Sequence, residues 1–241
     1  MARAEVVVIG AEVLTGKVTD ANGPFLCAEL RALGAELRRL TVVPDELEAI
    51  AETVRAASAR VDFVITTGGV GPTLDDLTFE AVAAAFGVGR RRDARLVDVL
   101  RAFFGDAVVE AHLRMADLPE GAELLFSDGL RFPVVKVRNV YVMPGSPGIL
   151  RKKWIALRER FREAPFVLRR VFVTLEEGLL APTLEAVRDA EPDVTLGSYP
   201  VFDDPAYAVQ VTLEAKDAAA VERATRRLLE RLDPRTVVRV A

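Results

Sequence analysis

The chain has 241 residues, of which 51% are hydrophobic, and a formal net charge of −4 at pH 7. This length allows one large domain or a large and a small one, and the hydrophobic content is sufficient for a sizeable core. The slightly negative charge argues against a nucleic-acid partner. The single cysteine, Cys27, excludes an internal disulfide and a thiolate zinc site.

The apolar runs of the chain are short. The first, at residues 6–9, is too short for the core of a signal peptide, and no later run approaches the length that spans a membrane. We therefore expect a cytoplasmic protein with no membrane partner. The single histidine, His112, lies in a polar stretch, so a histidine-based metal site cannot be made.

The first third of the chain alternates apolar, partly β-branched runs with helical patterns, which is typical of strands that alternate with helices. Such an order predicts a parallel sheet with right-handed crossovers. The predicted elements are a strand at 5–9, a loop at 10–16, a helix that ends before residue 34, a strand at 35–43, a helix that starts at 44–48, a strand at 63–65 and a helix at 81–86.

Two of these helices have recognisable start signals. Asp20 and Asn22 precede the first helix, which has Pro24 in its first turn. Before the second helix, Asp45 with Glu48 three residues later resembles a capping box, with Asp in place of Ser or Thr.

A glycine-rich loop follows the third strand and contains Gly68, Gly69 and Gly71. Glycines let the backbone approach a ligand closely, and a loop that leads into a helix presents backbone N–H groups to an anion. The loop is not a Walker A motif, because no Lys-Ser/Thr pair follows it. It is not the dinucleotide fingerprint either, since Leu74 occupies the third glycine position. We therefore expect a phosphate group at this loop.

Two carboxylates, Asp75 and Asp76, end the loop. Carboxylates repel a neighbouring phosphate unless a cation lies between them, so phosphate at this loop implies Mg²⁺ or a similar hard divalent ion. The alternative is that one of the two aspartates only caps the next helix.

Three polar groups come directly after predicted strands: Glu12, Asp45 and the loop that ends at Asp76. Ligands of parallel sheets bind beyond the carboxyl ends of the strands, and these ends lie along one edge. We expect the three to gather there.

The next part of the chain predicts a helical hairpin, three short strands and a final helix. The segment 144–148 precedes this last helix and offers further N–H groups, or is a plain strand-to-helix connection. The clusters 90–92 and 151–153 are basic and are interpreted as solvated helix ends. The predicted helices cover 93–104, 109–116 and 149–161, and the strands cover 124–126, 134–137 and 140–143.

Pro165 marks a change in the order of elements, so we place a boundary there, between residues 1–165 and 166–241. The second part reads as a small α+β domain with an antiparallel hairpin. It has no G-x-x-G, so it lacks the nucleic-acid clamp of a KH domain. Its predicted strands are 167–174, 194–199 and 207–214, and its helices are 180–190 and 218–232.

The loop at 66–78 resembles the signature of the CinA proteins and of the matching half of eukaryotic FAD synthase, within the molybdopterin-binding-like superfamily. Residues 10–16 match as well, and the segments 132–135, 139–147 and 197–200 are closer to the FAD synthase version. The resemblance covers nearly the whole chain. It implies an α/β fold, a Rossmann-like α/β/α sandwich with a mostly parallel sheet, followed by a small α+β domain. It also implies an oligomer, and we expect a homodimer.

For function, the resemblance implies metal-dependent cleavage of a pyrophosphate bond in ADP-ribose or FAD, with Mg²⁺, Mn²⁺ or Co²⁺. Asp76 and Asp45 would hold the metal, and Asp75 would assist. The expected catalytic residues are Asp76, Asp45 and Asp75, and the expected substrate-binding residues are Thr67, Gly68, Gly69, Gly71, Pro72, Thr73, Glu12, Asp20, Asn22, Gly145 and Ser146.

Two other functions use the same phosphate loop. One is binding or adenylylation of molybdopterin in molybdenum cofactor biosynthesis. The other is a non-catalytic scaffold that binds a nucleotide without turning it over. The sequence leaves all three open, because each needs the same loop.

Overall fold

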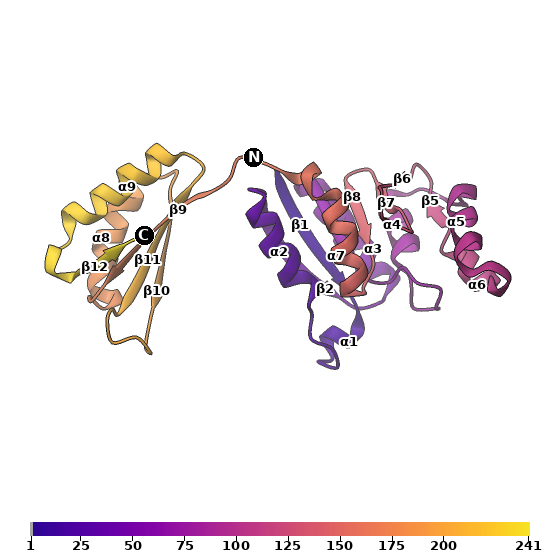
Figure 1. The fold of residues 1–241 in the computed structure, drawn as a ribbon, viewed down its shortest axis with the longest axis horizontal. Helices are drawn as coiled ribbons and strands as arrows, with labels where there is room; N and C mark the ends of the chain where they lie inside the picture. The colour runs from indigo at the N-terminus through magenta and orange to yellow at the C-terminus, as the bar shows by residue number, and fades with distance from the viewer. Residues whose placement is uncertain (1) are drawn as a thin grey trace. The chain divides into compact units, whose positions relative to one another are not determined.

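The computed structural model describes residues 2–241, which form two compact units; the first ends at Glu163 and the second covers Ala164–Ala241 (Figure 1). Each unit has an apolar core of its own. No helix in the described part of the chain is long and apolar enough to cross a bilayer.

The first unit is built on a six-stranded mixed sheet. The four strands at its centre and one edge run parallel, as expected, whereas β7 is antiparallel to both of its neighbours. A connection of only two residues, Arg138 and Asn139, joins β7 to β8, and so short a link allows only an antiparallel pair. The strand order is β2 (Glu36–Val43), β1 (Arg3–Ile9), β3 (Phe63–Thr67), β8 (Val140–Met143), β7 (Val134–Val137) and β6 (Glu123–Leu125).

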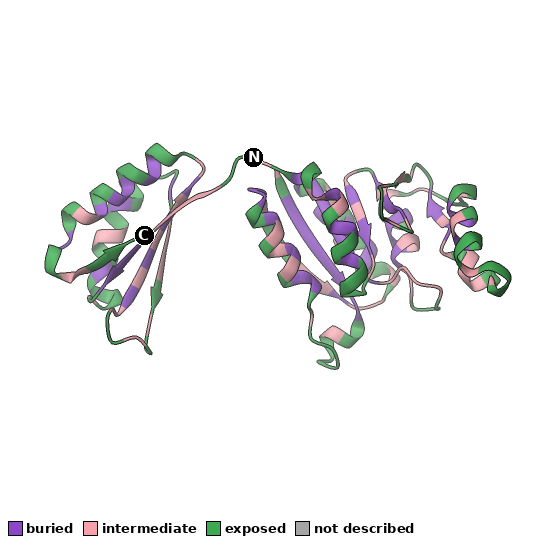
Figure 2. Ribbon diagram, viewed as in Figure 1, coloured by how far each residue is buried: buried purple, intermediate pink, exposed green. Residues whose placement is uncertain are grey.

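Helices cover both faces of this sheet, which confirms the predicted α/β/α sandwich (Figure 1). Helices α2 (Asn22–Ala32) and α7 (Pro147–Leu157) pack on one face around the fully buried Trp154. The other face is covered by α3 (Leu47–Arg60), α4 (Thr78–Phe86) and α5 (Ala94–Phe104). Figure 2 shows that β1 is buried along almost its whole length, as a strand between two helical layers must be.

Three predictions for this unit are wrong in detail. The loop at 10–16 contains a short helix, α1 (Ala11–Leu14). The basic cluster at 90–92 is not a helix end but a strand, β4 (Arg90–Arg92), which pairs antiparallel with β5 (Asp117–Pro119), and Arg92 also forms an ion pair with Asp117. The second basic cluster lies inside α7, and its third residue, Lys153, is buried. The remaining short elements are η1 (Gly105–Ala107), α6 (Glu110–Arg114) and η2 (Arg158–Phe161).

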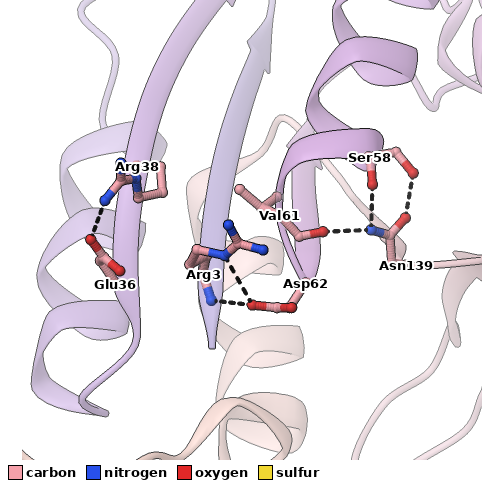
Figure 3. A network of polar contacts seen from close by, with 7 residues as sticks. All are labelled: Arg3, Glu36, Arg38, Ser58, Val61, Asp62 and Asn139. Atoms are coloured by element: carbon pink, nitrogen blue, oxygen red, sulfur yellow. Dashed lines mark hydrogen bonds and ion pairs between the residues drawn. The ribbon is translucent and has the colours of Figure 1, made fainter. Parts of the chain in front are cut away.

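Polar contacts hold the amino edge of the sheet together (Figure 3). The Asn139 amide donates to the carbonyls of Ser58 and Val61 at the end of α3, at 3.0 Å each. The Asp62 carboxylate accepts from the backbone N–H of Arg3 at 2.6 Å. These bonds tie the starts of β1, β3 and β8 to one another, which leaves the opposite, carboxyl edge for the site.

The second unit is a four-stranded antiparallel sheet with two helices on one face. Along β11, buried and half-buried residues alternate, as expected for a sheet covered on one side. The edge strand β12 was not predicted, because only four residues form it and two of its valines are exposed. The strand order is β10 (Thr195–Pro200), β11 (Val209–Ala215), β9 (Val167–Val173) and β12 (Val237–Val240), and the helices are α8 (Glu177–Ala190) and α9 (Ala218–Arg231), with η3 (Pro234–Thr236) before β12.

Candidate functional site

The carboxyl ends of three parallel strands meet at Gly68. Its backbone N–H donates to the carbonyl of Met143 at the end of β8, at 3.2 Å. Its φ is 108°, and a Cβ built on it would lie 2.1 Å from the carbonyl oxygen of Ile9, the last residue of β1. A Cβ on Gly145 would lie 3.3 Å from the Gly68 Cα atom. Only glycine fits this junction.

The glycine loop that follows presents unpaired donors. Within residues 2–241, the backbone N–H groups of Gly69, Val70 and Gly71 have no acceptor. Gly69 has a φ of 61°, and its carbonyl accepts from the N–H of Thr78, the first residue of α4, at 3.0 Å. Consecutive free N–H groups beside a helix N-terminus form an anion-binding concavity.

A second loop, residues 144–148, lies against the first and is fixed by buried side chains. The Asn22 amide donates to Thr67 Oγ1 at 3.0 Å and to the Gly145 carbonyl at 2.7 Å. The Thr67 hydroxyl donates to the Pro144 carbonyl at 2.9 Å. Asn22 and Thr67 therefore position both loops, while Gly145 and Ser146 are exposed at the surface.

Asp76 holds the far end of the glycine loop. Its Oδ2 accepts from the Thr73 backbone N–H at 2.8 Å and from the Thr73 hydroxyl at 2.5 Å. The carboxylate also folds over Gly71, where a Cβ would lie 2.6 Å from Oδ2. Its Oδ1 has no donor within residues 2–241. Asp76 lines a cavity of about 230 Å³ with Gly71, Pro72, Thr73, Arg90 and Arg114.

Asp75 is exposed and is not equivalent to Asp76. The Thr73 hydroxyl and the residue's own backbone N–H hold the pKa of the Asp75 carboxyl below its usual range. The Thr73 hydroxyl has only one proton to donate. Because its hydrogen bond to Asp76 Oδ2 has both the distance and the angles of a hydrogen bond, we assign that proton to Asp76. Neither aspartate caps α4, because Leu77 precedes that helix and no side chain accepts from its first turn. The capping alternative is therefore wrong.

Three other acidic residues were expected at the site. Asp45 Oδ2 accepts from the Ala11 backbone N–H at 2.7 Å, which links the loops after β2 and β1. The capping box with Glu48 is wrong, since α3 begins at Leu47 without a side-chain cap. The Asp20 carboxylate caps α2 by accepting from the N–H groups of Asn22 and Gly23. Glu12 is exposed beside Gly10.

The expected metal ligands Asp76 and Asp45 follow β3 and β2, which lie on either side of β1, and Asp45 is not among the residues that line the cavity of Asp76. In the described part of the chain, no three acidic, histidine or cysteine side chains gather into a metal cage. Asp76 and Asp45 each use one carboxylate oxygen to hold a loop and keep the other. Mg²⁺ binds in this manner, through one or two carboxylates, with water and ligand phosphate oxygens completing its coordination.

Sequence reasoning missed the basic residues near the loop. Arg114 donates to the Pro72 carbonyl at 3.3 Å, and Arg90 pairs with Glu80 of α4 at 2.7 Å. Both lie 14 residues or more from the loop in sequence, so only the fold brings them there. Lys153 had a usable signal, because it shares the apolar face of α7 with Leu150, Trp154 and Leu157 at helical spacing.

Fold and loop together define an α/β domain with an anion-binding glycine loop at the carboxyl edge of its sheet. A family model described as "probable molybdopterin binding domain" matches residues 5–162, and one described as "FAD synthase, middle domain" matches residues 165–241. The chain therefore belongs to the molybdopterin-binding domain family, with a FAD-synthase-type second unit.

Individual proteins agree with this assignment. The chain is 32% identical to a protein of Archaeoglobus fulgidus over 95% of its own length and 97% of the relative's. It is 30% identical to a probable FAD synthase of Caenorhabditis briggsae over 91% of its length, but spans only 47% of that relative. The chain also resembles the crystal structure of CinA from Thermoplasma acidophilum, a protein described as having unknown function: the match covers 67% of this chain and 99% of that one, with 27% identity and a TM-score of 0.62.

Proposed function

We propose that the protein is a metal-dependent nucleotide pyrophosphatase that hydrolyses a pyrophosphate of the ADP-ribose or FAD type. The observation that carries the proposal is the row of free N–H groups at Gly69, Val70 and Gly71 beside Asp76, which keeps one carboxylate oxygen without a donor. Donors and a carboxylate side by side suit a phosphate that arrives with a cation.

Each residue then has a role. The loop N–H groups bind phosphate oxygens, and the guanidinium group of Arg114, which lines a cavity with Gly71 and donates to the Pro72 carbonyl, favours a second phosphate. Asp76 and Asp45 would hold the ion, which supplies charge neutralisation and a more acidic bound water. Asn22 and Thr67 keep the two loops at a fixed separation, so the phosphate is oriented before reaction.

The family of the first unit favours a second candidate, which is binding or adenylylation of molybdopterin. The same loop would then receive the pterin's phosphate and ATP. Substrate separates the two candidates, because only a pyrophosphatase consumes ADP-ribose or FAD without a pterin.

The test is a panel of ADP-ribose, FAD, NADH and ATP with Mg²⁺, Mn²⁺ or Co²⁺, with products identified by mass. We expect AMP from ADP-ribose or FAD, formed only with metal. No product from any pair, together with calorimetric binding of ADP-ribose or FAD, would assign a non-catalytic nucleotide-binding scaffold instead.

We also propose that the protein is a homodimer, from its family and from the small size of the second unit. Light scattering at micromolar concentration should give twice the chain mass. A mass of one chain at that concentration would reject the dimer without affecting the proposed reaction.

A further inference from the structure

Lys153 is a buried cation without an acidic partner. It lies on the apolar face of α7 and is 8% exposed. Its Nζ donates to the carbonyls of Phe132, at 3.1 Å, and Pro133. No carboxylate within residues 2–241 pairs with it, and burial lowers the pKa of the Lys153 amine to about 8.

Two carbonyls leave this ammonium group incompletely satisfied. A lysine ammonium has three N–H donors, and the third has no acceptor in the described part of the chain. A buried positive charge that faces only neutral groups is costly. A further oxygen that carries negative charge, placed at the third N–H donor, would offset that cost. Anchoring the 132–133 segment to α7 accounts for two donors but not for the third.

Lys153 faces a cavity of about 170 Å³ in which every other lining residue is apolar. Two phenylalanines and a methionine give this cavity flat, polarisable walls suited to an aromatic ring. The lining residues beside Lys153 are Val70, Phe79, Leu96, Leu100, Met115, Phe132, Pro133, Val135, Val142, Pro144 and Ile149.

A second cavity, of about 360 Å³, shares Phe132, Ile149 and Lys153 with the first. Its other walls include Phe103, Lys152 and Arg131, and no acidic residue lines it. The Arg131 guanidinium lies 4.9 Å from the Phe103 ring centroid. Apart from Lys153, the first cavity is therefore lined by apolar side chains, and its neighbour carries Arg131, Lys152 and Lys153, a combination that suits an anionic compound with a planar apolar group.

The first cavity adjoins the phosphate loops. Val70 lies between Gly69 and Gly71, whose N–H groups are free, and Pro144 directly precedes Gly145. A ring bound in this cavity therefore lies next to the loop whose N–H groups would bind the phosphate of the same ligand.

We propose that this cavity binds a planar fused ring with carbonyl or enolate oxygens, of the flavin class, and that Lys153 donates to a ring oxygen. The assignment rests on the proposed function for the position of the phosphate. It favours FAD over ADP-ribose, since the flavin ring offers two carbonyl oxygens to the amine, whereas adenine offers only ring nitrogens as acceptors.

The test is direct binding to the full chain. Riboflavin, FMN and FAD are titrated with flavin fluorescence as the readout, which falls when the ring is enclosed, and ADP-ribose is titrated by calorimetry. We expect Lys153→Met to weaken flavin binding about tenfold to a hundredfold while ADP-ribose binding stays within about twofold. Methionine keeps the unbranched shape and removes the charge.

Lys136→Met is the matched control. It removes the same charge from β7, where Lys136 pairs with Glu123 outside both cavities, and should leave flavin binding unchanged. If Lys153→Met does not fold, Ile149→Trp replaces it, because Ile149 is 50% exposed and lines both cavities. Blocking the space should weaken flavin binding by at least tenfold.

Two results overturn the inference: flavins that bind no better than ADP-ribose, or flavin affinity that is unchanged in Lys153→Met or in Ile149→Trp. Hydrolysis of ADP-ribose and FAD is measured separately on the same samples. Flavin binding that depends on Lys153 without any hydrolysis would reject the proposed reaction and keep the ring site. Hydrolysis without flavin binding that depends on Lys153 would keep the proposed reaction and reject the ring site.

Discussion

The two units differ in where their glycines lie and in one buried cation, although each has a buried glutamate paired with arginine, Glu5 with Arg60 in the first and Glu191 in the second. In the first, strands end in glycine turns with free donors, and its buried cation, Lys153, has only carbonyl partners. In the second, the buried Glu191 pairs with Arg227 at 2.9 Å and Arg223 at 3.3 Å, and Gly197 lies within a regular strand. Within residues 2–241, the glycines with positive φ thus all lie in the first unit, and two of them, Gly68 and Gly69, are at the candidate site.

The largest expected effect contrasts two glycines. Gly68→Ala places a Cβ 2.1 Å from a backbone carbonyl at a φ of 108°, and we expect a loss of about 4 kcal/mol from backbone strain and overpacking. In Gly197→Ala the nearest atoms are the side chains of Thr212 and Tyr199, which can rotate, so the loss should stay below about 1 kcal/mol. Urea unfolding measures both. Equal losses of unfolding free energy in the two variants would contradict the proposed difference between Gly68 and Gly197.

The next effect concerns Lys153 and pH. Its folded pKa of about 8 lies below the ordinary value of 10.5, so between these pH values the unfolded chain binds more protons. Stability should therefore rise with pH across this range, by about 3 kcal/mol, and stay flat below pH 8 as far as this group is concerned. In Lys153→Met the rise should be absent. If the free energy of unfolding changes with pH in the same way in both proteins, Lys153 titrates in the folded state with its ordinary pKa.

A smaller but functional effect separates the two loop aspartates. Asp76→Asn retains an oxygen for Thr73 and removes the charge, so metal-dependent turnover should fall by about a hundredfold or more. Stability should change by less than about 1 kcal/mol. Asp75→Asn, at an exposed neighbour, should cost less activity. Turnover of Asp76→Asn equal to that of the unmodified protein, under every metal, would remove this loop from the reaction.

The smallest effect tests the paired charge of the second unit. Arg227 and Arg223 hold the pKa of the Glu191 carboxyl below its ordinary 4.5. The pair therefore stabilises the fold above that pH, and this contribution is lost as the pH falls through the lower folded pKa. Glu191→Gln should be less stable than the unmodified protein at pH 7, and the difference should shrink in acid. A difference that is constant from pH 7 to pH 3 would assign the effect to packing.

The glycine loop and its position at the carboxyl edge of the sheet could be predicted because their signals are local. An apolar run, three glycines and a following helix lie within one stretch of the chain, and the direction of parallel strands fixes the rest. The pairing of β4 with β5 could not be predicted, since it joins two three-residue strands that lie far apart in sequence, as the 25 residues between Arg92 and Asp117 show. The burial of Lys153, by contrast, had a local signal that our interpretation of residues 151–153 missed, since Lys153 shares a helical face with Leu150, Trp154 and Leu157.

The carboxylates divide in the same way. Asp20 as the cap of α2 follows from its place two residues before Asn22. The bond from Asp45 to the Ala11 N–H joins the ends of two neighbouring strands, so no local pattern contains it. Tertiary contacts therefore determine which acidic side chains retain a carboxylate oxygen that accepts no hydrogen bond from residues 2–241.

The two bonds of the Asn22 amide also set an order of events during synthesis. They join α2 to Thr67, which lies 45 positions after Asn22 in the sequence, and to Gly145, which lies 123 positions after it. Such distant contacts form only after long loops have closed. A nascent chain that ends before Met143 lacks both the second loop and the β8 carbonyl that accepts from Gly68, so these contacts cannot yet fix its glycine loop. Anion affinity should thus be acquired late, when most of the first unit has left the ribosome.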